Sequence, residues 1–233
     1  RKDRPPIATL ELTCSVGDLG HVRATTTDEG GRVDLNRAGS RLLRSLLIGV
    51  GLSPAEAGGL AAAIIDFRDS DGVVEPGGAE AEDYARAGLP GLPKNAPFDS
   101  VSELMQVLGM TAQIMSSLRP HVTVHAAQSG VDVSMATSEL VAMIARGSRL
   151  AGAAVVIDDI AGPELPREMR SLSSRRAFRI RSDALAGRAR FTREAVVEFA
   201  SDQAVDARIR FWRQVESDTG WPVSDQAPPP CRR

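Results

Sequence analysis

Aromatic residues are scarce in this chain of 233 residues, at 4% of the composition. Few aromatic rings are therefore available to stack against sugars, and the core has to be built from Leu, Val, Ile, Ala and Met. No apolar run reaches the roughly 18 residues that a membrane-spanning helix requires. Apolar residues still make up 42% of the chain, which is ordinary for a globular protein.

Motifs of enzymatic chemistry are also missing from the sequence. It contains no Gly-x-Ser-x-Gly nucleophile turn and no phosphate-binding glycine loop with a lysine. His121 and His125 have the spacing of zinc ligands on a helix, but the alternation around them indicates a strand, and no third ligand is evident. We therefore expect a protein that is not an enzyme.

Only two cysteines occur, Cys14 and Cys231, near opposite ends of the sequence. They could pair, because chain ends often lie close together, and a pair would imply an oxidising compartment. The sequence leaves open whether they do. The chain begins with Arg1 rather than Met, so we expect a leader or an anchor to precede it in the full protein.

Charge is unevenly distributed, although the formal net charge is only −2. Nine acidic residues against three basic ones fall between Asp66 and Glu103. Twelve arginines against six acidic residues fall between Arg167 and Arg213. The first region is either a solvated loop or a cation site, and the second is either an arginine-rich sheet or a surface for a partner.

Hydrophobic periodicity divides the chain into strands, helices and strands again. Residues 7–16 and 21–27 alternate and predict a hairpin. Three further strands are predicted over 176–182, 188–199 and 205–212, as an antiparallel meander. Helical spacing occupies the middle of the chain, where Ser53, Pro54 and Glu56 form a capping box. This order predicts an α+β fold in which a helical block is inserted into an antiparallel sheet.

One short phrase occurs twice, at an offset of 98 residues. Residues 33–38 read VDLNRA and residues 131–136 read VDVSMA, and each copy runs into an apolar helix start. We expect an extended arm followed by a polar helix cap, with Asn36 as the N-cap of the first helix. The repeat indicates a structural frame rather than an active site.

Two predicted helical pairs, at 46–67 and 104–118, resemble helix-hairpin-helix units. In nucleic-acid-binding proteins of that kind, a glycine turn such as Gly49-Val50-Gly51 offers N–H groups to a phosphate. Here no Lys or Arg follows either turn closely, Glu56 lies in the first turn of the second helix, and the adjacent insert is acidic. Scaffolding is the preferred interpretation, and a nucleic-acid-binding protein is the alternative.

Several longer phrases resemble the minor pseudopilin K family (general secretion pathway protein K) of bacterial type II secretion systems. They are residues 31–38, DFRDSD at 66–71, PGGAE at 76–80 and PKNAPFDS at 93–100. The similarity in sequence covers about residues 20–145. The rest of the chain is similar only in the order of its predicted elements. The resemblance implies a pilin-like fold, in which an N-terminal helix packs on an antiparallel sheet and a large α-helical domain is inserted into that sheet.

The resemblance also implies a location and partners. The N-terminal helix would anchor the protein in the bacterial inner membrane, with the soluble domain in the periplasm. The protein would cap the tip of the pseudopilus with two other minor pseudopilins and would not bind nucleic acid. We expect residues 1–33 and 126–226 to form the pilin-like domain, residues 34–125 the inserted domain, and residues 227–233 a disordered tail.

Calcium is associated with the inserted domain of this family, and the acidic insert at 71–97 has suitable chemistry. Calcium takes six to eight oxygen ligands from carboxylates, carbonyls and water. The spacing matches no EF-hand, because the downstream glutamate of that motif is missing. The candidate calcium ligands are Asp69, Asp71, Glu75, Glu80, Glu82 and Asp83.

Overall fold

The computed structural model describes residues 9–16, 20–89, 91–152, 157–158, 162–187, 189–200, 207–215 and 229–231. The chain divides into two compact units. The sheet unit combines the residues up to Glu29 with those from Arg175 onward, and the helical unit is Gly30–Ser174. None of the helices in the described ranges is long and apolar enough to cross a membrane.

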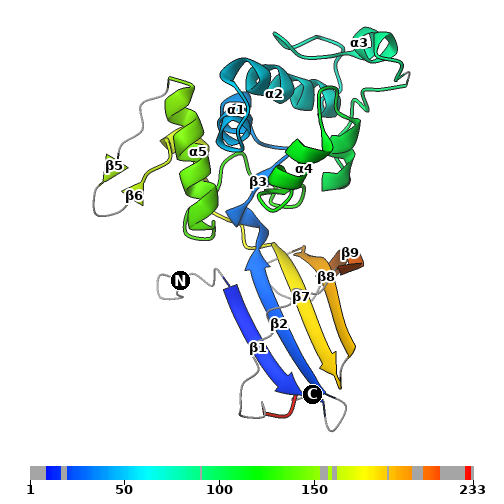
Figure 1. Ribbon diagram of the computed structural model, residues 1–233, viewed down its shortest axis with the longest axis vertical. Helices are drawn as coiled ribbons and strands as arrows, with labels where there is room; N and C mark the ends of the chain where they lie inside the picture. The colour runs from blue at the N-terminus through cyan, green and yellow to red at the C-terminus, as the bar shows by residue number, and fades with distance from the viewer. Residues whose placement is uncertain are drawn as a thin grey trace. The chain divides into compact units, whose positions relative to one another are not determined.

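Among the described residues, the sheet unit contains five antiparallel strands in the order β1-β2-β7-β8-β9 (Figure 1). Asp28 of β2 pairs with Phe178 of β7, so the opening hairpin and the closing meander form one continuous sheet, as the periodicity predicts. The strands are β1 (Thr9–Ser15), β2 (His21–Asp28), β7 (Ala177–Ala186), β8 (Ala189–Phe199) and β9 (Ala207–Val215).

The two faces of this sheet differ in chemistry. Residues directly opposite each other on neighbouring strands share a face, so the register sorts the side chains. One face is apolar and carries Leu10, Leu12, Ile180, Phe191, Ile209 and Trp212. The other face carries arginines paired with acids, as Arg23–Asp183, Arg179–Glu29, Arg179–Glu194 and Arg213–Glu194. One arginine, Arg193, lies on the apolar face, over the Trp212 ring.

The helical unit is built from short elements around a core of leucine, isoleucine, valine and alanine. Two short parallel strands, β3 and β4, lie in this unit, and α1 packs against both α2 and α5 (Figure 1). Its elements include β3 (Val33–Asp34), α1 (Ser40–Gly49), α2 (Pro54–Arg68), α3 (Ala81–Arg86), the 3-10 helix η3 (Val101–Gln106), α4 (Ala112–Leu118), β4 (Val122–Thr123) and α5 (Ser138–Leu150).

Shorter elements complete the two units. Strands β5 (Ile157–Asp158) and β6 (Gly162–Pro163) form a two-stranded antiparallel sheet. Two further 3-10 helices are η2 (Glu29–Gly31) and η4 (Arg167–Met169).

The helical unit extends well beyond the predicted end of the inserted domain at residue 125. It continues to Ser174, because α5 packs on α1 and the segment after α5 pairs with the second copy of the repeat. The backbone N–H of Val131 donates to the carbonyl of Met169 at 2.9 Å. The second copy of the repeat therefore belongs to the inserted unit and not to the sheet.

The predicted helix starts are confirmed in one case and wrong in another. Ser53 and Glu56 form the predicted capping box, with the Ser53 N–H donating to the Glu56 carboxylate at 3.0 Å. Asn36 is not an N-cap, because α1 begins four residues later with Gly39 as its cap. The Asn36 side chain instead exchanges two hydrogen bonds, of 2.9 and 2.7 Å, with the backbone of Phe98.

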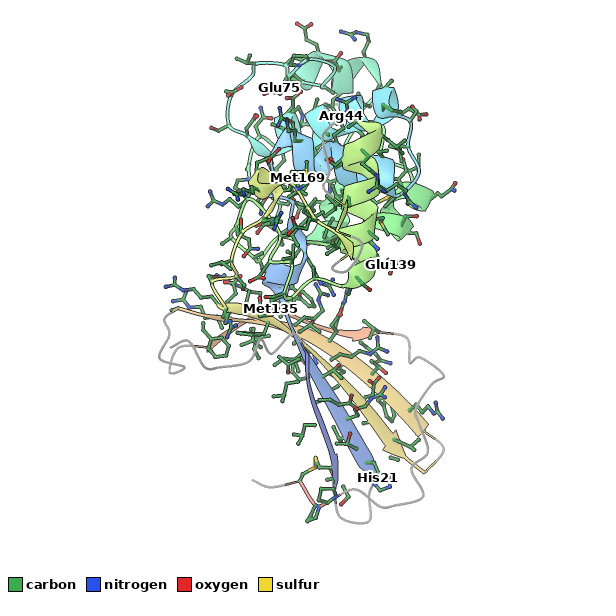
Figure 2. All side chains as sticks on the ribbon, turned by 90° about the vertical axis from the view of Figure 1, so that its left-hand side faces the viewer. His21, Arg44, Glu75, Met135, Glu139 and Met169 are labelled. Carbon is green, nitrogen blue, oxygen red and sulfur yellow. A yellow bond between two sulfur atoms is a disulfide. The ribbon has the colours of Figure 1, made fainter. Side chains whose placement is uncertain are left out.

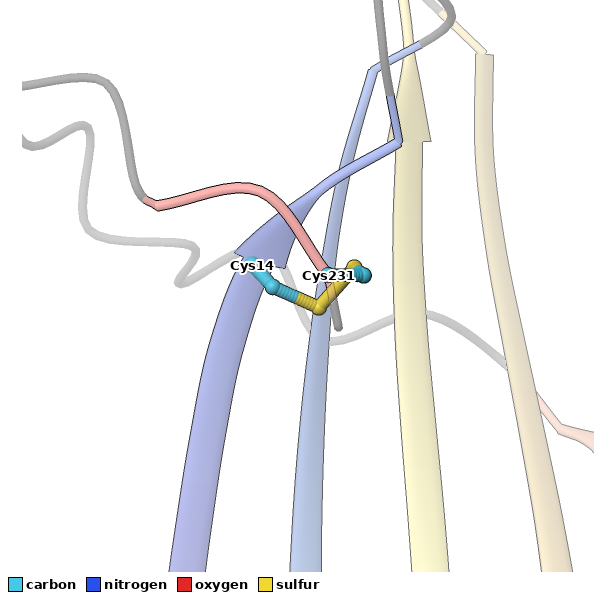
Figure 3. The surroundings of a disulfide bond; sticks show 2 residues. All are labelled: Cys14 and Cys231. Atoms are coloured by element: carbon cyan, nitrogen blue, oxygen red, sulfur yellow. A yellow bond between two sulfur atoms is a disulfide. The ribbon is translucent and has the colours of Figure 1, made fainter. Parts of the chain in front are cut away.

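The two cysteines form a disulfide with a Cα–Cα distance of 4.9 Å. Residues 229–231 of the predicted disordered tail are placed against β1 by this bond (Figure 3). The prediction of disorder is wrong for these three residues, because it took no account of a covalent link. Residues 227, 228, 232 and 233 lie outside the described residues.

Candidate cation site in the acidic insert

Asp66 anchors the acidic insert to helix α2. Its side chain is fully buried, and its two oxygens accept backbone N–H groups of the insert. Oδ1 accepts from Glu75 at 3.1 Å and Oδ2 accepts from Ala79 at 2.7 Å. The insert is therefore folded back onto α2 by one carboxylate rather than left as a solvated loop.

A tight turn at residues 75–78 brings the insert to this carboxylate. The N–H of Gly78 donates to the carbonyl of Glu75 at 2.7 Å, and Gly77 has a φ of +84°. Pro76 and Gly77 occupy the central positions, as is typical of a type II turn. A Cβ on Gly78 would lie 2.0 Å from Oδ2 of Asp66, so only glycine allows the carboxylate to come this close.

The second half of the insert is fixed by aromatic packing. Tyr84 on α3 is fully buried, and its hydroxyl accepts the N–H of Leu108 at 3.0 Å. The Phe67 ring stacks on Phe98 with centroids 5.0 Å apart and also contacts Tyr84. Three of the few aromatic residues in the chain therefore hold the insert in place.

Asp69 and Glu80, two of the predicted ligands, lie close to Asp66 and to each other. Burial raises the pKa of each of these three carboxyls, and the negative charge of neighbouring acids raises it further. Glu80 is only 6% exposed. Oδ1 of Asp69 and Oε1 of Glu80 are buried and have no hydrogen-bond partner. This arrangement concentrates negative charge and leaves two acceptor oxygens unsatisfied.

The other four predicted ligands are divided between two environments. Asp71 and Glu75 are exposed, but their charges contribute to the raised pKa of Asp66 and Asp69. Glu82 is exposed on α3. Asp83 accepts from the Glu80 N–H at 3.1 Å and from Arg86 at 2.9 Å, and these bonds lower its pKa. Glu82 and Asp83 thus belong to α3 rather than to the cluster around Asp66.

Across the described part of the chain, no three His, Cys, Asp or Glu side chains are grouped closely enough to hold a metal ion as they stand. The six ligands therefore stay a prediction. Sequence reasoning did not include Asp66 among them, although it is the carboxylate that organises the insert. The available signal was its position, as the single acid within the otherwise apolar run from Ala61 to Phe67.

The glycine turn between α1 and α2 does not offer its N–H groups to a ligand. The N–H groups of Val50, Gly51 and Leu52 donate to the carbonyls of Leu46, Ile48 and Leu47, and close the end of α1. The next N–H, that of Ser53, donates to Glu56. These bonds disfavour phosphate binding at this turn. The second predicted pair also differs from two α-helices, because its first member is the 3-10 helix η3.

Comparisons with known proteins agree with this architecture. Residues 22–127 match the family model for the type II secretion system (T2SS), protein K. A search of curated proteins finds no match. A solved structure, the GspK-GspI-GspJ complex from the enterotoxigenic Escherichia coli type 2 secretion system, contains a similar chain with a TM-score of 0.61. The two chains share 16% identity over 89% of this chain and 84% of the other.

The fold, an antiparallel sheet interrupted by a helical unit, is therefore shared with a chain of that complex. The family match covers the hairpin strand β2 and most of the helical unit, including the whole acidic insert. Residues 22–127, and with them most of the helical unit, therefore belong to the type II secretion system protein K family.

Proposed function

We propose that this protein is a non-catalytic subunit that caps the tip of the pseudopilus in the periplasm. The observation that carries the proposal is the insertion of a complete helical unit between two neighbouring strands of the sheet. Residues 30–174 interrupt the chain between β2 and β7, which are hydrogen-bonded neighbours. A unit of this size added to a pilin-like subunit would prevent further subunits from stacking on it.

The apolar face of the sheet supports a pilin-like mode of assembly. Leu10 and Leu12 on β1 are 56% and 60% exposed, and Trp212 on β9 is 58% exposed. An apolar face of this kind is costly in water and is usually covered by another element. We infer that it receives an N-terminal helix, whose far end anchors the full protein in the inner membrane.

The partners are two other minor pseudopilins. The similar chain in the solved complex is assembled with two other proteins, GspI and GspJ. We therefore expect this chain to form a ternary complex with the corresponding subunits of its own system. Size-exclusion chromatography with light scattering on the three co-expressed periplasmic domains should give a mass equal to their sum. Three separate species would contradict the assembly.

The capping role needs a test of its own. Because Asp28 pairs with Phe178, Glu29 and Arg175 can be joined by a short linker that replaces the helical unit. We expect the shortened full-length protein to enter pseudopili in cells that overproduce the major subunit. Electron microscopy should then show longer pseudopili than with the intact protein. Equal lengths, with the shortened protein incorporated, would contradict capping.

We further propose that the acidic insert binds calcium. The two unsatisfied buried oxygens, of Asp69 and Glu80, fit a hard cation that takes oxygen ligands. The charges of Asp71 and Glu75 act on Asp66 and Asp69, so these two carboxylates lie in the same region of the insert and would complete the site. Bound calcium would supply positive charge that offsets the repulsion among these acids. Glu82 and Asp83 would contribute less, because α3 holds them elsewhere.

Isothermal titration and thermal melting test the calcium proposal. The intact protein should bind calcium and melt at a higher temperature in its presence. The double variant Asp69→Asn/Glu80→Gln should lose both effects. Glu139→Gln is the matched control, because Glu139 is an exposed acid on α5, at the opposite end of the helical unit from Glu75 (Figure 2). No heat and no shift in the intact protein would refute calcium binding.

A further inference from the structure

One row of side chains across the apolar face of the sheet has small residues in its middle and larger ones beside them. Ala24 on β2 and Ser182 on β7 lie between Leu12 on β1 and Arg193 on β8. Leu12 is 60% exposed. Small residues between larger ones leave room for a convex element, and an α-helix, about 10 Å across, has that shape. This row therefore suits a helix lying along β2 and β7.

Arg193 is the charged residue of this row. The central carbon of its guanidinium lies over the Trp212 ring, 5.8 Å from the ring centroid. The residues directly opposite it are neutral, Ser182 on β7 and Gln214 on β9. Within the described ranges, no acidic side chain forms an ion pair with Arg193. The ring attracts its charge only weakly and offers no lone-pair acceptor to its N–H groups.

Covering the apolar face changes the surroundings of Arg193. Its side chain is exposed in this chain, so water can satisfy its donors. An element lying on the face displaces that water, and a charge buried without a partner is costly. A guanidinium is matched best by a carboxylate, which accepts two parallel hydrogen bonds from it. The covering element therefore has to bring a carboxylate to Arg193.

We propose that the N-terminal helix inferred above carries an acidic side chain that pairs with Arg193 and so fixes the position of the helix on the sheet. This rests on the proposed function, in which that helix covers the apolar face. A helix that precedes β1 is tethered to the strand that carries Leu10 and Leu12 on the same face. The tether raises its effective concentration at this face above that of a separate molecule.

Fluorescence quenching of Trp212 tests whether the helix covers the face. Trp221→Phe, with Phe in place of any tryptophan upstream of residue 1, leaves Trp212 as the only emitter. Trp212 is 58% exposed in this chain, so acrylamide should quench it at least about twofold less in the full-length protein than in residues 1–233, both in the same detergent. Equal quenching overturns the proposed covering together with this inference. Shielding that requires the two other minor pseudopilins would assign the face to a partner and overturn the pairing.

Melting temperatures test the pairing itself. Arg193→Met should lower that of the full-length protein by at least about 6 °C, because the carboxylate is left buried without its counter-charge. In residues 1–233 it should cost no more than about 3 °C, for the lost contact with Trp212. Arg208→Met is the matched control, because Arg208 is an exposed arginine on the other face, and it should act alike in both forms. Equal shifts for Arg193→Met in the two forms, with Trp212 shielded, overturn the pairing alone.

Charge reversal identifies the partner of Arg193. Arg193→Glu should lower the melting temperature of the full-length protein more than Arg193→Met does, because two carboxylates then meet. In this background each acidic residue of the helix is changed in turn to arginine. One combination should restore at least about half of the lost melting temperature, since it re-forms the pair with its charges exchanged. If none does, or if the helix holds no acid outside its membrane segment, the inference is overturned.

Discussion

Gly49 in α1 and Gly147 in α5 face the opposite helix at equivalent positions of the repeat. A Cβ on Gly147 would lie 1.9 Å from the carbonyl oxygen of Ser45, and a Cβ on Gly49 would lie 2.6 Å from that of Met143. The residue numbers of the two glycines differ by 98, and so do those of Ser45 and Met143. The contact between the two helices is therefore reciprocal. The glycine of each copy approaches the carbonyl of the equivalent residue in the other copy.

The extended arms of the repeat are also equivalent. Asp34 accepts the N–H groups of Asn36 and Ala127, both at 2.7 Å. Asp132, 98 residues later, accepts those of Ser134 at 3.0 Å and Ser173 at 2.8 Å. Each aspartate closes its own turn and ties a distant segment to it. The repeated phrase is thus a structural device used twice in one unit.

The close contact of α1 with α5 at Gly49 and Gly147 predicts that one added methyl group has a large effect on stability. Gly147→Ala should destabilise the protein by about 2–3 kcal/mol or more, because the new methyl group meets backbone and forces α1 and α5 apart. Gly49→Ala should have a smaller effect, of about 1–2 kcal/mol. Gly58→Ala in α2 is the control, because its Cβ meets nothing within 4 Å. It should be neutral or stabilise by up to about 1 kcal/mol in urea unfolding.

The two aspartates of the repeat should be equally important for stability. Asp34→Ala and Asp132→Ala each leave two backbone donors without their acceptor, at a cost of about 1–3 kcal/mol for a buried donor. Asn at either position keeps one acceptor oxygen, so the Asn variants should lose less of the free energy of unfolding than the Ala variants. Chemical denaturation of the four variants measures this. If the Ala variant at either position unfolds like the wild type, that aspartate does not hold its segment.

The close approach of Gly78 to Asp66 predicts that the insert is sensitive to one methyl group. Gly78→Ala should displace the Asp66 carboxylate, lower the melting temperature and weaken calcium binding at least about tenfold. Gly72→Ala in the same insert is the control, since its Cβ would lie in open space. Melting curves and calcium titrations of both variants give the comparison. Equal behaviour of the two would show that this contact does not position the insert.

The raised pKa values of Asp66, Asp69 and Glu80 predict a pH dependence with a definite sign. A carboxyl whose pKa is higher in the folded than in the unfolded state binds its proton more tightly when folded. Its contribution favours folding below the unfolded pKa, and this advantage is lost as the pH rises through the folded pKa. Without calcium, the protein should gain stability from these groups on acidification from neutral pH.

The double variant Asp69→Asn/Glu80→Gln isolates this contribution of the carboxyls to the pH dependence of stability. Its melting temperature at neutral pH should exceed that of the calcium-free wild type, because two mutually repelling charges are gone. The difference should shrink as the pH falls towards the ordinary carboxyl range. Melting curves at several pH values, with a chelator present, measure it. A difference that grows on acidification would contradict the assigned cause.

Local signals in the sequence determined much of this structure. Alternation marked the hairpin and the meander, and the Ser53–Glu56 box marked the start of α2. The repeat is visible in the amino-acid sequence, whereas its role in packing is not. These features are readable because they depend on contacts between residues a few positions apart, or on a side-chain period that one strand or helix carries by itself.

Only the tertiary structure decided how distant segments meet. The packing of α5 on α1 moved the boundary of the inserted unit to Ser174, and the disulfide placed the C-terminal end on β1. Asp66 gained its role from the N–H groups of Glu75 and Ala79, which are 9 and 13 positions away. Such contacts depend on which surfaces are complementary after folding, and a single sequence carries no periodic signal for them.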